Sequence, residues 1–94
     1  MNRKNKDFIY DIKIDLHGYT TMQAFCKTLD TIEGAYKSGA RNILFITGVG
    51  NTERGTGAIR AEFSVYLDHP RVRDTILSTE YTNGQYRVRL RKIK

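Results

Sequence analysis

The feature that most constrains the fold is an alternation of polar and apolar residues near the amino terminus. It runs through Asp11, Ile12, Lys13, Ile14, Asp15, Leu16 and His17. A period of two residues is typical of a β-strand with one buried face. The apolar residues are therefore expected to face a core, while Asp15 and His17 point outward together. Residues two apart in a strand are roughly 6.5–7 Å apart, so an acid and an imidazole could reach one group of a substrate.

A helix is expected after this strand, beyond a turn at His17-Gly18-Tyr19. Thr20 and Gln23 have the spacing of a capping box, and Gly39 is a natural stop. Apolar residues recur at helical spacing on one face, at Phe25, Leu29, Ile32 and Tyr36. Cys26, within this helix, is expected to pack rather than to act as a nucleophile.

The second half of the chain predicts a strand, a helix and a hairpin. The consecutive apolar residues in 42–47 predict a central strand covered on both faces or nearly so. A second helix is expected from about Ala58, and Asp68-His69-Pro70 is expected to end it. Its apolar stripe is Ile59, Phe63, Tyr66 and Leu67. A weaker strand is predicted over 72–80, and Asn83-Gly84 predicts a tight turn into a last alternating strand.

The order β-α-β-α-β-β predicts an α/β domain built as an α+β two-layer sandwich. A four-stranded mixed sheet is expected to carry both helices on one face. Residues 1–7 are expected to form a frayed basic segment and residues 8–94 a single domain, because 94 residues suffice for one modest core. No apolar run approaches the roughly 18–20 residues of a membrane span, and no signal peptide is evident. Together with a single cysteine, this predicts a cytoplasmic protein without a membrane partner.

The basic charge of the chain indicates a polyanionic partner. The formal net charge is +6, which favours nucleic acid. Arg87, Arg89 and Arg91 share one face of the last predicted strand, and guanidinium groups bind phosphates well. The alternative is that these charges only protect an edge strand from aggregation.

A glycine-rich stretch joins the strand at 42–47 to the second helix. Its glycines are Gly48, Gly50, Gly55 and Gly57. Backbone N–H groups and the helix dipole favour an anion at such a junction. The stretch is not a P-loop, because Thr56 stands where the lysine is required, and Glu53 interrupts the dinucleotide fingerprint. A flexible connection is the alternative interpretation.

Two motifs together resemble the Smr (small MutS-related) domain. They are Ile14-Asp15-Leu16-His17-Gly18 and Thr47-Gly48-Val49-Gly50, the second followed by Gly55-Thr56-Gly57. The family carries a Leu-Asp-Leu-His-Gly-type motif and a Thr-Gly-x-Gly or His-Gly-x-Gly motif at this separation. The resemblance spans about residues 10 to 92. Ile14 replaces the usual leucine, and residues 51–54 lengthen the loop.

The resemblance implies nucleic-acid binding, with nicking or endonuclease activity on DNA or RNA in several members, including messenger RNA on stalled ribosomes. It assigns cleavage to Asp15 and His17. A basic residue near the start of the second helix matters in some members, and Arg60 and Arg54 are the nearest matches. With the glycines and the basic strand, the predicted substrate-binding set is Thr47, Gly48, Gly50, Arg54, Gly55, Gly57, Arg60, Arg87, Arg89 and Arg91.

The Asp-x-His pair suits phosphodiester cleavage. Histidine titrates near pH 6.5, so His17 could serve as a general acid or base. Asp15 could orient the imidazole, or bind a divalent metal such as magnesium if one is used. Alternatively, the pair only fixes the loop, and the domain is a non-catalytic nucleic-acid or ribosome-binding module. The element order also resembles the C-terminal domain of bacterial translation initiation factor three. A small protein-interaction domain with a basic surface is a third interpretation.

Overall fold

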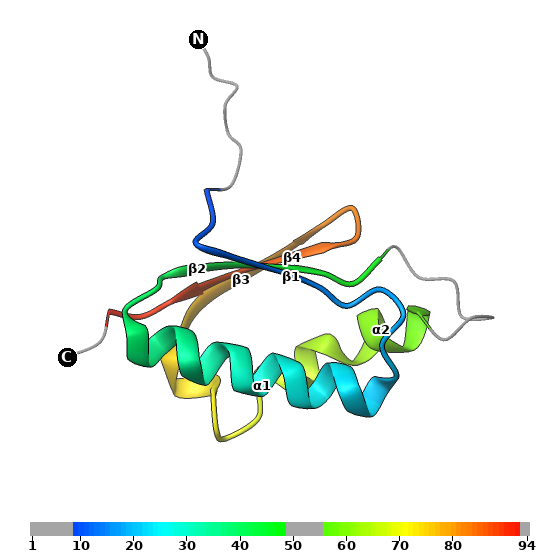
Figure 1. The fold of residues 1–94 in the computed structure, drawn as a ribbon, viewed down its shortest axis with the longest axis horizontal. Coiled ribbons are helices and arrows are strands. Elements are labelled where there is room, and N and C mark those ends of the chain that lie inside the picture. The colour runs from blue at the N-terminus through cyan, green and yellow to red at the C-terminus, as the bar shows by residue number, and fades with distance from the viewer. Residues whose placement is uncertain (1–8, 49–55, 93–94) are drawn as a thin grey trace, which may run out of the picture.

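A four-stranded sheet with two helices on one face forms the domain (Figure 1). The computed structural model describes residues 9–48 and 56–92. Its elements are β1 (Ile12–Asp15), α1 (Thr21–Ser38), β2 (Asn42–Ile46), α2 (Thr56–Leu67), the 3-10 helix η3 (Arg73–Thr75), β3 (Ile76–Thr82) and β4 (Gln85–Leu90). The predicted β-α-β-α-β-β order and the α+β fold are confirmed. No helix in the described ranges is long and apolar enough to cross a membrane.

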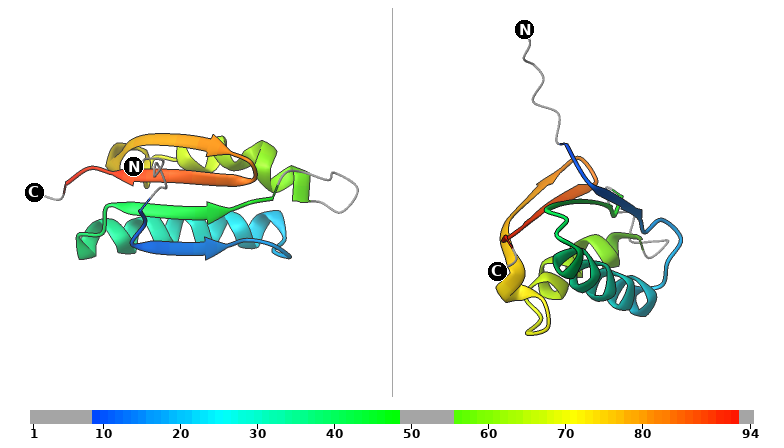
Figure 2. Two further views of the ribbon diagram at one scale, coloured as in Figure 1. Left: turned by 90° about the horizontal axis from the view of Figure 1, so that it is seen from above. Right: turned by 60° about the vertical axis from the view of Figure 1, so that its left-hand side comes forward.

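The strands lie in the order β1-β2-β4-β3. β1 pairs with β2 in parallel, and β4 is antiparallel to both of its neighbours (Figure 2). Both crossovers, β1-α1-β2 and β2-α2-β3, therefore progress in the same sense along the sheet, which places both helices on one face. β1 and β2 finish at the same end of the sheet, and the Asn83-Gly84 turn between β3 and β4 lies at that end too. We call this end of the sheet the carboxyl edge.

The boundaries of α1 are set by the residues that the sequence indicated. The hydroxyl oxygen of Thr20 accepts the Gln23 backbone N–H at 3.1 Å, and the Gln23 side chain accepts the Thr20 N–H at 3.0 Å. Gly39 ends the helix in the left-handed conformation, with φ of 89°. α2 begins at Thr56, two residues earlier than expected, and ends at Leu67 as predicted.

The core lies between the helices and the sheet. Phe45 of β2 and Phe63 of α2 are fully buried there, with ring centroids 5.1 Å apart. The opposite face of the sheet, which we call the open face, carries no helix formed by residues 9–48 or 56–92 (Figure 1). Leu44 lies on the open face but is only 6% exposed. β2 is thus nearly covered on both sides, as its consecutive apolar residues indicated.

Two expectations about the third strand and the packing of α1 were wrong. The third strand starts at Ile76 rather than at residue 72, because residues 73–75 form a 3-10 turn and the Thr75 hydroxyl donates to the Val72 carbonyl at 2.7 Å. Val72 is fully buried. It fills the core from a turn, but in the sequence its apolar side chain resembles that of a buried strand residue. Cys26 is exposed rather than packed. The turn is confirmed, with positive φ at both Asn83 and Gly84.

Candidate functional site

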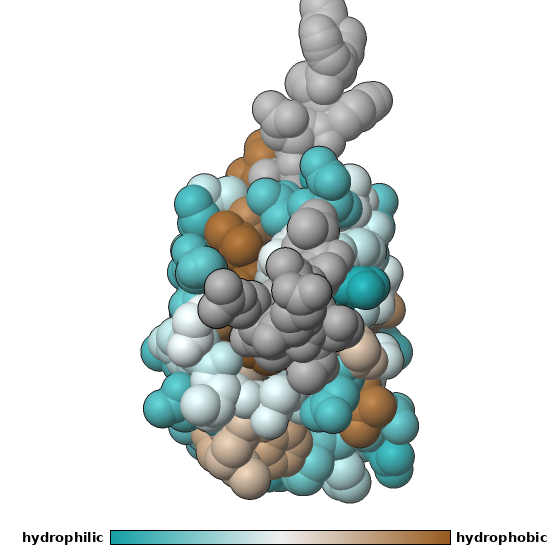
Figure 3. Space-filling view, turned by 90° about the vertical axis from the view of Figure 1, so that its right-hand side faces the viewer, coloured by the Kyte–Doolittle hydropathy of each residue, from teal (hydrophilic) through white to brown (hydrophobic). Residues whose placement is uncertain are grey.

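The two sequence motifs meet at the carboxyl edge because β1 and β2 are parallel neighbours. The backbone N–H of Leu16 still donates to the Ile46 carbonyl at 2.9 Å, so the two segments stay paired up to these residues. The turn that contains His17 and the segment that contains Gly48 therefore leave the sheet side by side. Figure 3 looks onto this end of the molecule, where most of the coloured surface is hydrophilic to intermediate.

Asp15 is the last residue of β1 and is exposed at the open face. Its Oδ1 accepts a hydrogen bond from the backbone N–H of His17 at 2.9 Å. The next residue, Gly18, has φ of 86°, which suits glycine. A side-chain acceptor for the N–H two residues later is a turn-forming contact. The carboxylate thus holds the first residue of the turn in place.

His17 belongs to the turn and not to the strand. Its exposed side chain lines an open depression beside the first half of α1, together with Gly18, Tyr19, Gln23, Cys26, Lys27 and Asp30. Asp15 and His17 were expected to share one face of the strand. Only Asp15 lies in the strand, because β1 ends at Asp15, so the expectation was wrong for His17. The hydrogen bond between the two residues joins the carboxylate to the backbone and not to the imidazole.

The carbonyl of Gly84 ties the end of β2 to the β3–β4 turn. It accepts the backbone N–H groups of Thr47 at 2.9 Å and of Gly48 at 3.0 Å. The Thr47 side chain also points inward, with its hydroxyl 3.4 Å from the same carbonyl, and Thr47 is only 3% exposed. Gly48 has φ of 84°, a conformation that L-residues avoid. Thr47 therefore fixes the position of the Gly48 backbone from the interior.

Arg60 and Tyr81 lie together at this edge. The Arg60 guanidinium carbon is 5.9 Å from the centroid of the Tyr81 ring. The Tyr81 hydroxyl accepts the Gly84 N–H at 3.0 Å and lies 3.4 Å from the Gly48 carbonyl. Tyr81 was not among the predicted site residues. The pairing of β4 with β2, which are distant in the sequence, is what brings the β3–β4 hairpin and Tyr81 beside Gly48.

The open face carries Arg87 and Arg89, in agreement with the alternation of the last strand. In the sheet register, Arg87 follows Lys13 and Leu44 in one row, and it lies 3.7 Å from the Glu80 carboxylate of β3. The Nε of Arg89 donates to the side chain of Asn42 at 3.2 Å. Arg91 lies beyond the end of β4 and is exposed. These arginines extend away from the carboxyl edge.

The catalytic and binding roles of all the predicted site residues remain predictions, and the structure does not describe three of these residues. Gly50, Arg54 and Gly55 lie outside the described residues, and Gly57 lies in the first turn of α2. Within residues 9–48 and 56–92, no group of three or more His, Cys, Asp or Glu side chains could hold a metal ion. Asp15 would offer a metal one carboxylate. The donor set described does not fit a metal held by the protein alone.

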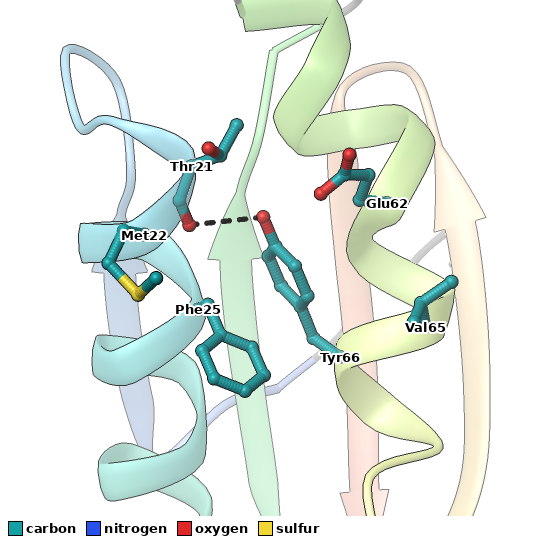
Figure 4. A pocket seen from close by; sticks show the side chains of 6 residues that line it. All are labelled: Thr21, Met22, Phe25, Glu62, Val65 and Tyr66. Carbon is teal, nitrogen blue, oxygen red and sulfur yellow. Dashed lines mark hydrogen bonds between the residues drawn. The ribbon is translucent and has the colours of Figure 1, made fainter.

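A separate pocket of about 270 Å³ lies between the two helices (Figure 4). Its lining is largely apolar and consists of Thr21, Met22, Phe25, Glu62, Val65 and Tyr66. The Tyr66 hydroxyl donates to the Thr21 carbonyl at 3.2 Å. Burial, and then the nearby Glu62 carboxylate, raises the pKa of the Tyr66 phenol. None of the predicted site residues lines this pocket.

Comparison with known protein families gives a match over most of the chain. The family model of the Smr domain matches residues 14–90, a range that includes both motifs and the whole sheet except the first residues of β1. Searches of curated proteins and of solved structures found no match. Smr domains bind nucleic acids, and some of them are nucleases. The chain belongs to the Smr domain family.

Proposed function

We propose that this domain binds nucleic acid at the carboxyl edge and cleaves a phosphodiester bond there, with His17 as the general acid or base. The parallel pairing of β1 with β2 carries the proposal, because it puts the His17 turn beside the backbone of Gly48. The imidazole that would transfer protons and the glycine backbone that would meet a phosphate then lie on neighbouring segments at this edge of the sheet. Membership in a nucleic-acid-binding family supports the choice of substrate.

Phosphate binding would fall to Gly48 and Arg60. The positive φ of Gly48 and its lack of a side chain let a phosphate approach the backbone. The Nε of Arg60 is buried and has no hydrogen-bond partner among the described residues. A guanidinium without a carboxylate partner keeps its charge for a phosphate oxygen, and would stabilise negative charge that builds up during cleavage.

On RNA, the 2′-oxygen would attack the adjacent phosphorus and the 5′-oxygen would leave. His17 would take the proton of the 2′-hydroxyl while solvent protonates the leaving 5′-oxygen, or would protonate the leaving oxygen while solvent takes the proton of the 2′-hydroxyl. Imidazole can do either near neutral pH. The products are a 2′,3′-cyclic phosphate and a 5′-hydroxyl. On DNA, water would attack the phosphorus while His17 takes its proton. The bond from phosphorus to one ester oxygen would break, and that oxygen would take a proton from solvent. Neither route places a step on a metal ion.

Asp15 would act as a positioning residue through the turn that it holds. Its carboxylate accepts the backbone N–H of His17, and its own side chain lies on the open face rather than in the depression that His17 lines. Losing this hydrogen bond would loosen the backbone that carries the imidazole. A turn held in one conformation keeps a catalytic group within reach of its proton.

The open face would guide the nucleic-acid backbone toward the site. Lys13, Arg87 and Arg89 all lie on it. Cationic side chains along a sheet contact phosphates without reading sequence. This role predicts affinity that falls with salt. A cytoplasmic location, expected from the sequence, also stays a prediction.

The test is cleavage by the purified protein of end-labelled RNA and DNA, with and without a chelator. His17→Ala and Asp15→Ala are purified in the same way. We expect cleavage by the wild type, none by His17→Ala, and a reduced rate for Asp15→Ala. Cleavage that survives in both variants would come from a contaminant or from another site, and would contradict the proposal.

The Asp15–His17 contact also favours a second candidate, a non-catalytic nucleic-acid or ribosome-binding module. Holding the turn is a sufficient structural reason for a carboxylate at position 15. In that case the wild type binds nucleic acid and does not cleave it, and His17→Ala binds equally well. Binding measured beside cleavage therefore separates the two candidates.

A further inference from the structure

Tyr81 occupies a junction of the site that no motif of the chain indicates. It pairs with Tyr86 in the register of β3 and β4, and the two ring centroids are 4.9 Å apart. Residues directly opposite each other lie on the same face of a sheet. Tyr86 packs on Phe63 of the core, with ring centroids 4.5 Å apart, so Tyr81 lies on the helix side of the sheet. At 37% exposure, its ring is accessible at the carboxyl edge.

The hydroxyl of Tyr81 joins two backbone segments of the site. It accepts the N–H of Gly84 at 3.0 Å and is 3.4 Å from the carbonyl of Gly48, to which it donates. Gly84 in turn accepts the N–H of Gly48 at 3.0 Å. The end of β2 and the β3–β4 turn are thus linked in both directions. A link of this kind holds the Gly48 backbone in the conformation that would meet a phosphate.

The ring of Tyr81 contacts the cation of the site. The Arg60 guanidinium carbon lies 5.9 Å from the ring centroid, within the range of a cation–π interaction. In the described part of the chain, Arg60 forms no ion pair, and its buried Nε has no hydrogen-bond partner. The aromatic face is therefore the contact that orients this guanidinium without neutralising it. A carboxylate in the same place would compete with a phosphate for the charge.

We propose that Tyr81 is the positioning residue of the site: its ring aims the Arg60 guanidinium, and its hydroxyl fixes the Gly48 backbone, so that both meet the same phosphate. The inference rests on the proposed function, because it takes the ligand of Arg60 and Gly48 to be a nucleic-acid phosphate. It adds a residue that the family motifs do not contain in this chain.

The test combines a double-mutant cycle with an observation of Arg60 itself. Variants Tyr81→Leu, Arg60→Ala and the double variant are titrated with a 12-nucleotide single-stranded oligonucleotide by fluorescence anisotropy. Tyr81→Leu should weaken binding about two- to five-fold in the wild-type background, the size of an exposed cation–π contact. In Arg60→Ala its effect should be smaller, because only the hold of the hydroxyl on the Gly48 backbone is then left to lose. Additive losses from Tyr81→Leu and Arg60→Ala would overturn the proposal.

Nuclear magnetic resonance separates this role from a merely structural one. A merely structural role of Tyr81 would leave the Arg60 side-chain resonance unchanged. The Nε–H resonance of Arg60 should shift in Tyr81→Leu, because the ring current is lost, and stay in place in Tyr81→Phe. The Gly84 amide should exchange with solvent faster in both variants, because each lacks the hydroxyl. Tyr10→Leu is the matched control, since Tyr10 is 42% exposed and precedes β1 at the other end of the sheet.

The two readouts also separate this inference from the proposed function. If the wild type does not bind the oligonucleotide, the proposed function fails, and the Arg60 resonance still decides whether Tyr81 places the guanidinium. An Nε–H resonance unchanged in Tyr81→Leu overturns the inference even where the wild type binds and cleaves. Binding and cleavage by the wild type, with a shifted resonance and non-additive losses, support both.

Discussion

The Oδ1 of Asp15 accepts the backbone N–H of His17 at 2.9 Å, so the two residues of the family motif are joined through the main chain. This contact predicts that the acceptor at position 15 matters more than the charge. Asp15→Asn can keep an acceptor oxygen, whereas Asp15→Ala removes it. We expect Asp15→Ala to lower the free energy of unfolding by about 1 kcal/mol. Cleavage should also slow in Asp15→Ala, and Asp15→Asn should restore most of both properties.

Urea unfolding and single-turnover cleavage measure the two effects on the same preparations. Equal loss of cleavage in Asp15→Asn and Asp15→Ala, with stability kept in Asp15→Asn, would mean that the carboxylate charge acts in the reaction. That outcome would contradict a role limited to holding the turn.

The backbone conformation of Gly48 predicts that a substitution at this position changes both stability and oligonucleotide binding. Its φ of 84° is strained for any L-residue, although an added Cβ would meet no atom within 4 Å. Gly48→Ala should therefore destabilise the fold by about 1 kcal/mol through the backbone alone, and weaken oligonucleotide binding. Gly34→Ala is the matched control. Gly34 lies within α1 with equal space and no positive φ, so alanine there should stabilise by about 0.5–1 kcal/mol.

The pair is compared by urea unfolding and by anisotropy. Stabilisation in both variants would show that Gly48 tolerates a side chain, and its proposed approach to phosphate would lose its main support.

The open face predicts the salt dependence of binding. If Arg89 contacts a phosphate, Arg89→Ala should lower the slope of log affinity against log salt by roughly 0.7–0.9. Arg71→Ala is the control, because Arg71 pairs with Glu33 and Asp30 of α1 on the helix layer. Titrations at several salt concentrations give the slopes. A slope unchanged in Arg89→Ala and lowered in Arg71→Ala would place the nucleic acid on the helices instead.

Acid should weaken the fold through Asp11. Its Oδ2 accepts the backbone N–H groups of Arg41 and Asn42 at 2.9 and 3.0 Å, and these bonds, that of Arg41 first, lower the pKa of the carboxyl group. A carboxyl group with a lowered folded pKa stabilises the fold above its unfolded pKa, about 3.9. This contribution is lost as the pH falls through the folded value.

Unfolding measured between about pH 6 and pH 2 should therefore show a smaller difference between wild type and Asp11→Asn as the pH falls. Asp68→Asn, at an exposed aspartate after α2, is the control. A difference that grows toward low pH would mean that the wild-type bonds do not favour the charged carboxylate.

Local patterns predicted most of the elements. The capping box at Thr20, the stop at Gly39 and the turn at Asn83-Gly84 are all confirmed, because each depends on residues a few positions apart. The two family motifs also predicted that Asp15 and Gly48 belong to one site, and the parallel pairing of β1 with β2 places them at the same edge of the sheet.

Contacts between distant residues could not be predicted from these patterns. The position of β4 between β2 and β3 depends on pairings such as Leu44 with Arg87, and this order puts Tyr81 at the site. Val72 has the pattern of a strand residue because burial from a turn requires the same apolar side chain as burial from a strand. The direction of the His17 side chain depends on where β1 ends, which alternation alone does not fix.

The most direct test of the central claim is the chemical identity of the ends produced from a labelled single-stranded RNA, compared between wild type and His17→Ala. Wild type should produce 2′,3′-cyclic phosphate and 5′-hydroxyl ends, and His17→Ala should bind the RNA without cutting it. RNA bound but left intact by the wild type, or the same ends produced equally fast by His17→Ala, would contradict a catalytic role for this edge of the sheet.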